Sequence, residues 1–298
     1  MTNFIGNSSL AWLDNATAAA ASGGAPFFAY IAPHAPHVPA TPAHEYENAP
    51  LPFGDEAPRT PNWNWGTAHH HWLVSQKAPL SPELITFSDQ LFARRLRATM
   101  SVDDVLTEVF ALLRTRGLLD NTYIIYTSDH GYDLGQFRLA SGKFNAFENC
   151  IRVPFFVAGG GVPAGLDLSS KMVNNVDVGP TVLELAGLAG GGYATDGTSF
   201  APLLRSGGGG AAWRDRLLFE YWGLGYTERG PCHNGTTSCP GVESLEDAPS
   251  NSWSGLRIMN GTHDLVYAEF RPDSTTPLLR ANTNFTLVWR AVPRSYSR

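Results

Sequence analysis

The chain has 298 residues, of which 43% are hydrophobic, so it is long enough to bury a sizeable core. Its net charge of −6 is spread along the sequence without a basic block, which argues against a nucleic-acid partner or an anionic membrane surface. No apolar run reaches the length of a transmembrane helix, and residues 1–7 lack the basic and apolar regions of a secretory signal, so we expect neither feature.

The first half of the chain alternates an apolar run, a loop and a periodic segment. Residues 26–32 (PFFAYIA) are continuously apolar and aromatic, which predicts a buried strand. Residues 33–61 are rich in Pro, His and Ala and should be an irregular surface loop. Hydrophobic residues then recur at three- and four-residue spacing over residues 88–119, which predicts a helix that stops at Gly117.

Two further apolar runs follow in the middle of the chain. Residues 122–128 (TYIIYTS) and 153–158 (VPFFVA) are β-branched and aromatic, and we expect both to be buried strands. Asp177 is a candidate N-cap for a helix that ends at Gly187, with Pro180 in its first turn. This order of strands and helices indicates an α/β fold with a mainly parallel sheet flanked by helices.

The C-terminal third differs in composition, because short patterned pieces alternate with Gly-rich loops beyond about Gly190. Residues 217–222 and 265–270 are expected to be strands of a smaller antiparallel sheet. We therefore divide the chain into a main portion, residues 1–205, and a smaller C-terminal subdomain, residues 206–298.

Cysteines and glycosylation acceptors leave the cellular compartment open. Cys232 and Cys239 bracket a Gly-rich loop and could pair if the compartment is oxidising, whereas Cys150 should be a buried apolar residue. N-x-[ST] triplets arise often by chance, so each is weak evidence for secretion. The five acceptors are Asn7, Asn15, Asn234, Asn260 and Asn284.

The strand predicted at residues 122–128 runs directly into Asp129, His130 and Gly131. Ligands in open α/β sheets lie outside the carboxyl ends of the strands, and an Asp and a His in series there can face one metal or one anion. Taken alone, however, the triplet is more often an Asx-type turn than a site.

Three other polar positions invite a functional interpretation. His37 has prolines close on both sides, which would hold its imidazole in place at little entropic cost. Lys143 precedes an apolar strand and could bind an anionic oxygen, although most lone lysines are solvated. The run from His69 through His70 to His71 is not expected to bind metal, because consecutive side chains point in different directions; Trp72 is the expected packed residue.

Together these pieces resemble the sulfatase family of the alkaline-phosphatase-like superfamily, and within it the N-acetylglucosamine-6-sulfatase type. The resemblance runs in the family's order from about residue 25 to residue 201, and weakens towards residue 270. The matching stretches are PFFAYIAPHAPHVPA, WGTAHHHWLV, SVDDVLTEV, NTYIIYTSDHGYDLGQFRL, KFNAFENCIRVP and NNVDVGPTVLELAGL.

The resemblance implies a role for each matched position. Asp129 and His130 correspond to the family's late pair of calcium ligands, where many members have Asn at the second position. Lys143 corresponds to the lysine that binds the sulfate oxygens, and His37 to the histidine that assists the leaving oxygen. The implied cofactor is Ca²⁺, held weakly without the family's early ligands, and the implied partner is a sulfated sugar or glycan.

The family's nucleophile, a formylglycine made from a C-x-P-S-R or similar motif, has no counterpart around any of the three cysteines. The family's early Asp-Asp calcium ligands and Lys-x-His anion contacts are also missing. We therefore expect only the C-terminal portion of an alkaline-phosphatase-like domain, with some sheet strands absent, and no hydrolysis of sulfate esters by this chain.

Three interpretations remain open on the sequence. The chain is part of an active sulfatase, or a pseudoenzyme that binds sulfated glycans without turnover, or, least favoured, a phosphatase or phosphonate hydrolase of the same superfamily. The family is lysosomal or secreted, which is the localisation that the resemblance implies.

Overall fold

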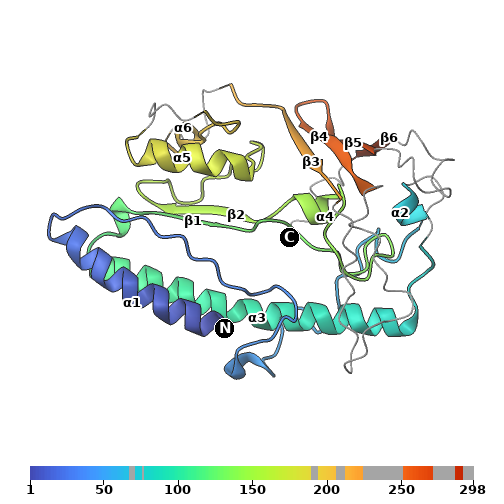
Figure 1. Cartoon of the computed structure of the whole chain (residues 1–298), viewed down its shortest axis with the longest axis horizontal. Helices are drawn as coiled ribbons and strands as arrows, with labels where there is room; N and C mark the ends of the chain where they lie inside the picture. The colour runs from blue at the N-terminus through green and yellow to red at the C-terminus, as the bar shows by residue number, and fades with distance from the viewer. Residues whose placement is uncertain are drawn as a thin grey trace.

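The computed structural model describes residues 1–66, 71–75, 77–188, 194–205, 212–223, 251–270 and 286–290. Figure 1 shows a layered arrangement in which a two-stranded sheet separates two groups of helices. The long helices α1 (Thr2–Ala21) and α3 (Pro82–Thr115) lie on one side, and α5 (Val178–Leu185) and α6 (Ala201–Arg205) on the other. The C-terminal strands form a second sheet at the end of the molecule beyond α4 (Glu148–Ile151).

Helix α3 confirms the predicted helix but begins earlier, at Pro82 rather than Ser88. Ser81 is the N-cap, and its hydroxyl accepts a hydrogen bond from the Leu84 backbone N–H at 3.4 Å. Proline at the first helical position needs no hydrogen-bond acceptor for its nitrogen, so the pair makes a favourable helix start. The helix ends where predicted, since Gly117 has a φ of 66°.

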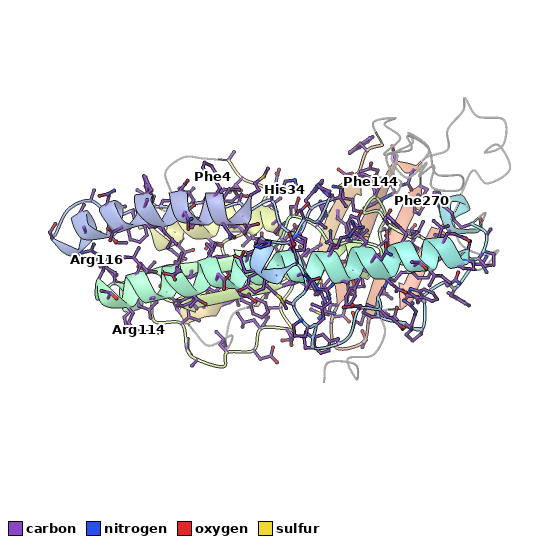
Figure 2. The ribbon with its side chains drawn as sticks, turned by 90° about the horizontal axis from the view of Figure 1, so that it is seen from below. Phe4, His34, Arg114, Arg116, Phe144 and Phe270 are labelled. Carbon is purple, nitrogen blue, oxygen red and sulfur yellow. The ribbon has the colours of Figure 1, made fainter. Side chains whose placement is uncertain are left out.

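Helix α1 was not predicted, because its buried face lacks an apolar stripe. The buried residues are Thr2, Gly6, Leu13 and Thr17, three of them small. α1 runs beside the C-terminal half of α3 in the same direction (Figure 2). A Cβ on Gly6 would lie 2.5 Å from Val105 Cγ2, so the small residue permits the close approach of the two helices.

The predicted parallel sheet is not found among the described residues. Strands β1 (Tyr123–Thr127) and β2 (Phe155–Gly159) confirm two predicted strands, but they pair antiparallel, with Ile125 opposite Val157. A parallel pair needs a long crossover, usually a helix. The connection between β1 and β2 contains only the four-residue helix α4, which is too short to serve as a crossover helix. The chain returns along β1 in the opposite direction instead.

The strand predicted at residues 26–32 is wrong as secondary structure. The segment is extended, and Phe27, Ala29 and Ile31 pack onto the core between α1 and α3. On the opposite face the side chains of Phe28 and Tyr30 are 67% and 85% exposed. The alternation is that of a strand, but the segment pairs with no strand in the described part of the chain.

The smaller C-terminal antiparallel sheet is confirmed, with strand order β3-β4-β5-β6. Its strands are β3 (Arg216–Tyr221), β4 (Trp253–Met259), β5 (Asp264–Phe270) and β6 (Thr286–Arg290). The sequence predicted β3 and β5 but missed β4 and β6. The remaining elements are the short helix α2 (Trp72–Ser75) and the 3₁₀ turns η1 (His44–Tyr46), η2 (Leu119–Asn121) and η3 (Asn175–Asp177).

Helix α5 confirms the prediction of a helix after Asp177, but the Asp177 side chain does not cap α5. It is fully buried and forms a two-pronged ion pair with Arg214, with N–O distances of 2.9 and 3.0 Å. The same carboxylate accepts hydrogen bonds from the backbone N–H groups of Asn174 and Thr198, both at 2.7 Å. Asp177 therefore joins η3 to the segment that leads into β3.

Cys150 is buried, as predicted. No helix in the described ranges is both long enough and apolar enough to cross a bilayer. Several predictions concern positions outside the described residues, namely the pairing of Cys232 with Cys239, the acceptors Asn234 and Asn284, and the first two histidines of the run, His69 and His70.

Candidate functional site

The site begins at the end of β1, where the chain turns through Ser128, Asp129 and His130. The Asp129 side chain is 82% exposed, and its Oδ2 lies 3.2 Å from His130 Nε2. His130 Nδ1 lies 2.8 Å from the Gly131 carbonyl oxygen, which can only accept, so Nδ1 carries the hydrogen. In the neutral ring Nε2 then presents a lone pair beside the Asp129 carboxylate, so two electron-pair donors lie together, as in a partial binding site for a cation.

Asn175 holds this turn from a remote part of the chain. Its Nδ2 donates to the backbone carbonyls of Ser128 and Asp129, at 3.1 and 3.2 Å. The Ser128 hydroxyl also donates to the carbonyl of His130 at 3.0 Å. The turn is therefore fixed by side chains on both sides, while the Asp129 carboxylate stays open to solvent.

Gly131 allows the turn to pack against α4. A Cβ at this position would lie 1.9 Å from the Asn149 carbonyl oxygen. The close approach brings the Gly131 and Tyr132 N–H groups within hydrogen-bond distance of the Cys150 and Asn149 carbonyls, at 2.8 and 2.9 Å. Glycine is required here by contact with the neighbouring backbone.

Lys143 lies on the turn that pairs with this segment. The Asp133 N–H donates to the Gly142 carbonyl at 2.8 Å, so Lys143 follows directly after a residue bonded to the Asp129 loop. The Lys143 side chain is half-buried, with Nζ 5.8 Å from the centre of the Phe144 ring. The structure therefore brings the predicted residues Asp129, His130 and Lys143 into one group of packed loops.

The loop that carries His37 is linked to these loops through Arg95, a residue that the sequence analysis missed. Arg95, on α3, donates to the Pro36 carbonyl at 3.0 Å and places its guanidinium 4.3 Å from the centre of the Tyr132 ring. Burial lowers the pKa of Arg95. The exposed His37 ring lies edge-on to His34, with centroids 5.1 Å apart. Arg95 thus connects the His37 loop to the residue that follows Gly131.

The calcium site implied by the resemblance does not fit the described residues alone. Calcium takes six to eight oxygen ligands. In the described ranges no group of three or more His, Cys, Asp or Glu side chains gathers. Asp129 supplies one carboxylate, and His130 supplies nitrogen rather than oxygen, so these two residues form at most part of such a site.

A buried polar cluster lies behind the loops. Asp133 is 0% exposed, and burial raises the pKa of its carboxyl to about 7. Asn145 Nδ2 donates to its Oδ2 at 2.6 Å, and Asn149 Nδ2 donates to its Oδ1. The Cys150 thiol lies 3.4 Å from Oδ2. No sequence pattern indicates this cluster, because its members are ordinary polar residues that only the fold brings together.

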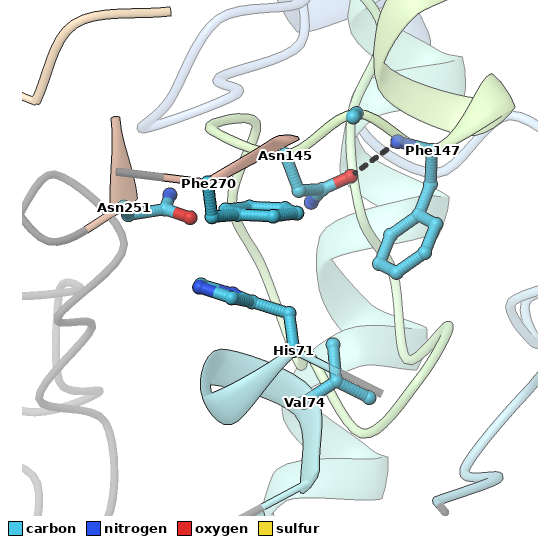
Figure 3. A pocket seen from close by; sticks show the side chains of 7 residues that line it. His71, Val74, Asn145, Phe147, Asn251 and Phe270 are labelled. Atoms are coloured by element: carbon cyan, nitrogen blue, oxygen red, sulfur yellow. Dashed lines mark hydrogen bonds between the residues drawn. The ribbon is translucent and has the colours of Figure 1, made fainter. Parts of the chain in front are cut away.

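A hollow next to Asn145 contains the third histidine of the run (Figure 3). His71 is buried and stacks on Phe270, with ring centres 3.6 Å apart. Burial lowers the pKa of His71 to about 3, so the ring is neutral at physiological pH. His71 is therefore a packing residue; the side chain of Trp72, which was expected to pack, lies outside the described part of the chain.

Comparison with known proteins gives one consistent family. A family model described as Sulfatase matches residues 2–188. N-acetylglucosamine-6-sulfatase from Capra hircus is 38% identical over 276 residues, which cover 91% of this chain and 48% of that protein. The Homo sapiens N-acetylglucosamine-6-sulfatase has the same identity and coverage. The chain therefore spans about half the length of these relatives.

Solved structures with the same fold include a phosphonate monoester hydrolase from Silicibacter pomeroyi. It has a TM-score of 0.65 and 22% identity, covering 96% of this chain and 54% of that chain. The yidJ protein from Bacteroides fragilis has a TM-score of 0.64 and 16% identity, covering 90% of this chain and 49% of that chain. Identities this low concern the fold and not the reaction.

Proposed function

The chain belongs to the sulfatase family, and from this premise we propose that it supplies the sulfate-binding side of a site for sulfated glycans. The observation that carries the proposal is the packing of the Lys143 turn against the Asp129–His130 turn. One ammonium and one cation-attracting pair lie on loops that hydrogen-bond to each other. A sulfate ester requires such compensation of its negative charge.

Each residue has a distinct proposed role. The Lys143 ammonium binds sulfate oxygens and neutralises their charge. In a hydrolase that also supplied a nucleophile to form the new bond to sulfur, the His37 imidazole would donate a proton to the sugar oxygen as the S–O bond breaks, because an alkoxide is a poor leaving group unless it is protonated. Asp129, with His130, contributes to a Ca²⁺ site completed by ligands from elsewhere. Such an ion would supply positive charge beside the sulfate oxygens.

The described chemistry lacks a nucleophile. No cysteine of the 298 residues lies in a C-x-P-S-R context, and positioning groups alone do not replace covalent catalysis. This chain is therefore proposed to bind the sulfate group without cleaving it. If the transcript upstream of Met1 encodes that motif in frame, the same residues serve an active hydrolase; otherwise they serve a glycan-binding module.

We base the proposed ligand and the proposed cellular location on the names of related proteins. Two are N-acetylglucosamine-6-sulfatases, and a Drosophila melanogaster extracellular sulfatase SULF-1 homolog is 36% identical over 188 residues, covering 58% of this chain and 16% of that protein. A sulfated amino sugar is the proposed ligand, and a lysosomal or extracellular site the proposed location. We keep residues 1–205 and 206–298 as the proposed portions of the chain.

Calorimetric titration of the 298-residue protein with N-acetylglucosamine 6-sulfate tests the proposal, with the unsulfated sugar as the matched ligand. We expect binding of the sulfated sugar alone. Lys143→Ala should weaken it roughly tenfold or more, as expected for a lost charged hydrogen bond, whereas Lys171→Ala should not. Asp129→Asn should weaken binding in the presence of Ca²⁺, whereas Asp120→Asn, at the other end of β1, should not.

Turnover is measured on the same preparation with an aryl sulfate. We expect no release of sulfate. Equal affinity for the sulfated and unsulfated sugars would contradict sulfate recognition, and measurable hydrolysis by this chain would contradict the proposed lack of a nucleophile. Hydrolysis of a phosphonate monoester in place of a sulfate ester would favour the third interpretation of the sequence.

A further inference from the structure

The buried Asp133 has no part in the chemistry proposed above, yet three donors converge on its carboxylate. Asn145 and Asn149 each donate through Nδ2, to different oxygens, and the Cys150 thiol lies 3.4 Å away. The orientation of the Asn145 amide is set independently, because its Oδ1 accepts from the Phe147 N–H at 3.1 Å. Above its pKa of about 7 the group is a carboxylate and can accept all three contacts at once, which an amide cannot.

These contacts join the two loops of the site from behind. The donors belong to the segment that follows Lys143, whereas Asp133 belongs to the segment that follows Asp129 and His130. Backbone hydrogen bonds run between the same two segments, from Gly131, Tyr132 and Asp133. The carboxylate is the side-chain anchor of this contact, and it lies where water does not compete.

We propose that Asp133 is a positioning residue for the anion site, and that its buried carboxylate fixes the Lys143 turn against the Asp129–His130 turn. The role of Lys143 in binding sulfate rests on the proposed function; the anchoring of its turn does not. Replacing the carboxylate by an amide turns one acceptor into a donor that faces another donor, so the contact must rearrange. Lys143 lies two residues before Asn145, so a rearrangement of the Asn145 contact is expected to move the turn that carries Lys143.

The chain offers a direct readout, because it contains only three lysines, Lys77, Lys143 and Lys171. Reductive methylation with ¹³C-formaldehyde gives each a dimethylamine signal in an NMR spectrum of the full chain. The Lys143 signal should report its distance from the Phe144 ring through the ring current. In Asp133→Asn we expect this signal to shift by more than its linewidth, while the Lys77 and Lys171 signals stay in place.

Asp177→Asn is the matched control, because Asp177 is equally buried and its carboxylate is also hydrogen-bonded on both oxygens, but in a different network. It should lower the melting temperature and leave the Lys143 signal unchanged. If Asp133→Asn does not fold, Asn149→Ala removes a half-buried member of the cluster, and the same Lys143 shift is expected. An unmoved Lys143 signal in the folded variant, or an equal shift in Asp177→Asn, would overturn the proposal.

Sulfate is then titrated into the same labelled samples. In the unsubstituted protein a sulfate-dependent shift of Lys143 supports the proposed function, and its absence counts against that function alone. Where sulfate binds, Asp133→Asn should weaken its affinity roughly tenfold, as expected for a displaced charged donor. Undiminished affinity in a variant whose Lys143 signal has moved would overturn the link between anchoring and recognition.

Discussion

Gly131 occupies a position where a side chain has no room. In Gly131→Ala the new Cβ would meet the Asn149 carbonyl 1.9 Å away, so the backbone of the site must shift. We expect a loss of about 1–3 kcal/mol in the free energy of unfolding, typical of overpacking, measured by urea denaturation.

Gly179→Ala is the matched control within helix α5. No atom lies within 4 Å of a Cβ built there, and alanine favours helix over glycine. This variant should be about 0.5–1 kcal/mol more stable than the unsubstituted protein. If both alanine variants lose stability equally, the clash with the Asn149 carbonyl is not the cause of the loss at Gly131.

His71 should make stability depend on pH. Its pKa is about 3 when folded and 6.5 when unfolded, so only the unfolded chain takes up the proton between these values. The stabilising contribution is therefore complete above pH 6.5 and lost as the pH falls towards 3. Between pH 7 and pH 5 the loss should be about 2 kcal/mol, and it should disappear in His71→Phe.

Asp133 should change the stability with pH in the opposite direction to His71, over an overlapping pH range. Because burial raises its pKa from 3.8 to about 7, its contribution is complete below pH 3.8 and lost as the pH rises towards 7. The difference in unfolding free energy between the unsubstituted protein and His71→Phe, measured at each pH, therefore gives the contribution of His71 alone. His44, whose side chain is 95% exposed, is the control for the substitution itself, and His44→Phe should not remove the pH dependence that is assigned to His71.

At the scale of elements, the Asp177–Arg214 pair joins η3 and α5 to the start of β3. Arg214→Ala would leave the fully buried Asp177 charge without its partner. We expect this to cost about 3–5 kcal/mol of unfolding free energy, seen as a lower urea midpoint. Arg216→Ala, which breaks the exposed pair with Asp215, should have little effect. Similar losses in both variants would mean that burial does not matter here.

The elements that the sequence predicts well are those with a strong local pattern. The helical period of α3 and the apolar runs of β1 and β2 predict these elements correctly, because each pattern is contained in one short stretch of sequence. Helix α1 was missed since its buried face is made of small residues, which show no hydrophobic period. Residues 26–32 were mispredicted because a strand needs a partner, and partners are not encoded locally.

The site follows the same division. The candidate roles of Asp129, His130, Lys143 and His37 rest on motifs that occur in the family's order, because the strand-end position of Asp129 and His130 alone is more typical of a turn. Asn175 and Arg95 were not predictable, because the bonds that make them important span 46 and 59 residues of sequence. The anchoring of Asp133 and the burial of His71 likewise depend on packing that no single segment specifies.

At the scale of the whole molecule, residues 26–32 have a consequence for behaviour in concentrated solution. An extended row with Phe28 and Tyr30 outward, and with no strand paired to it in the described chain, can accept a strand from another copy. We expect concentration-dependent turbidity that Tyr30→Lys reduces, because a charge in such a row acts against aggregation. Phe53→Lys, at an equally exposed loop position, should leave turbidity unchanged.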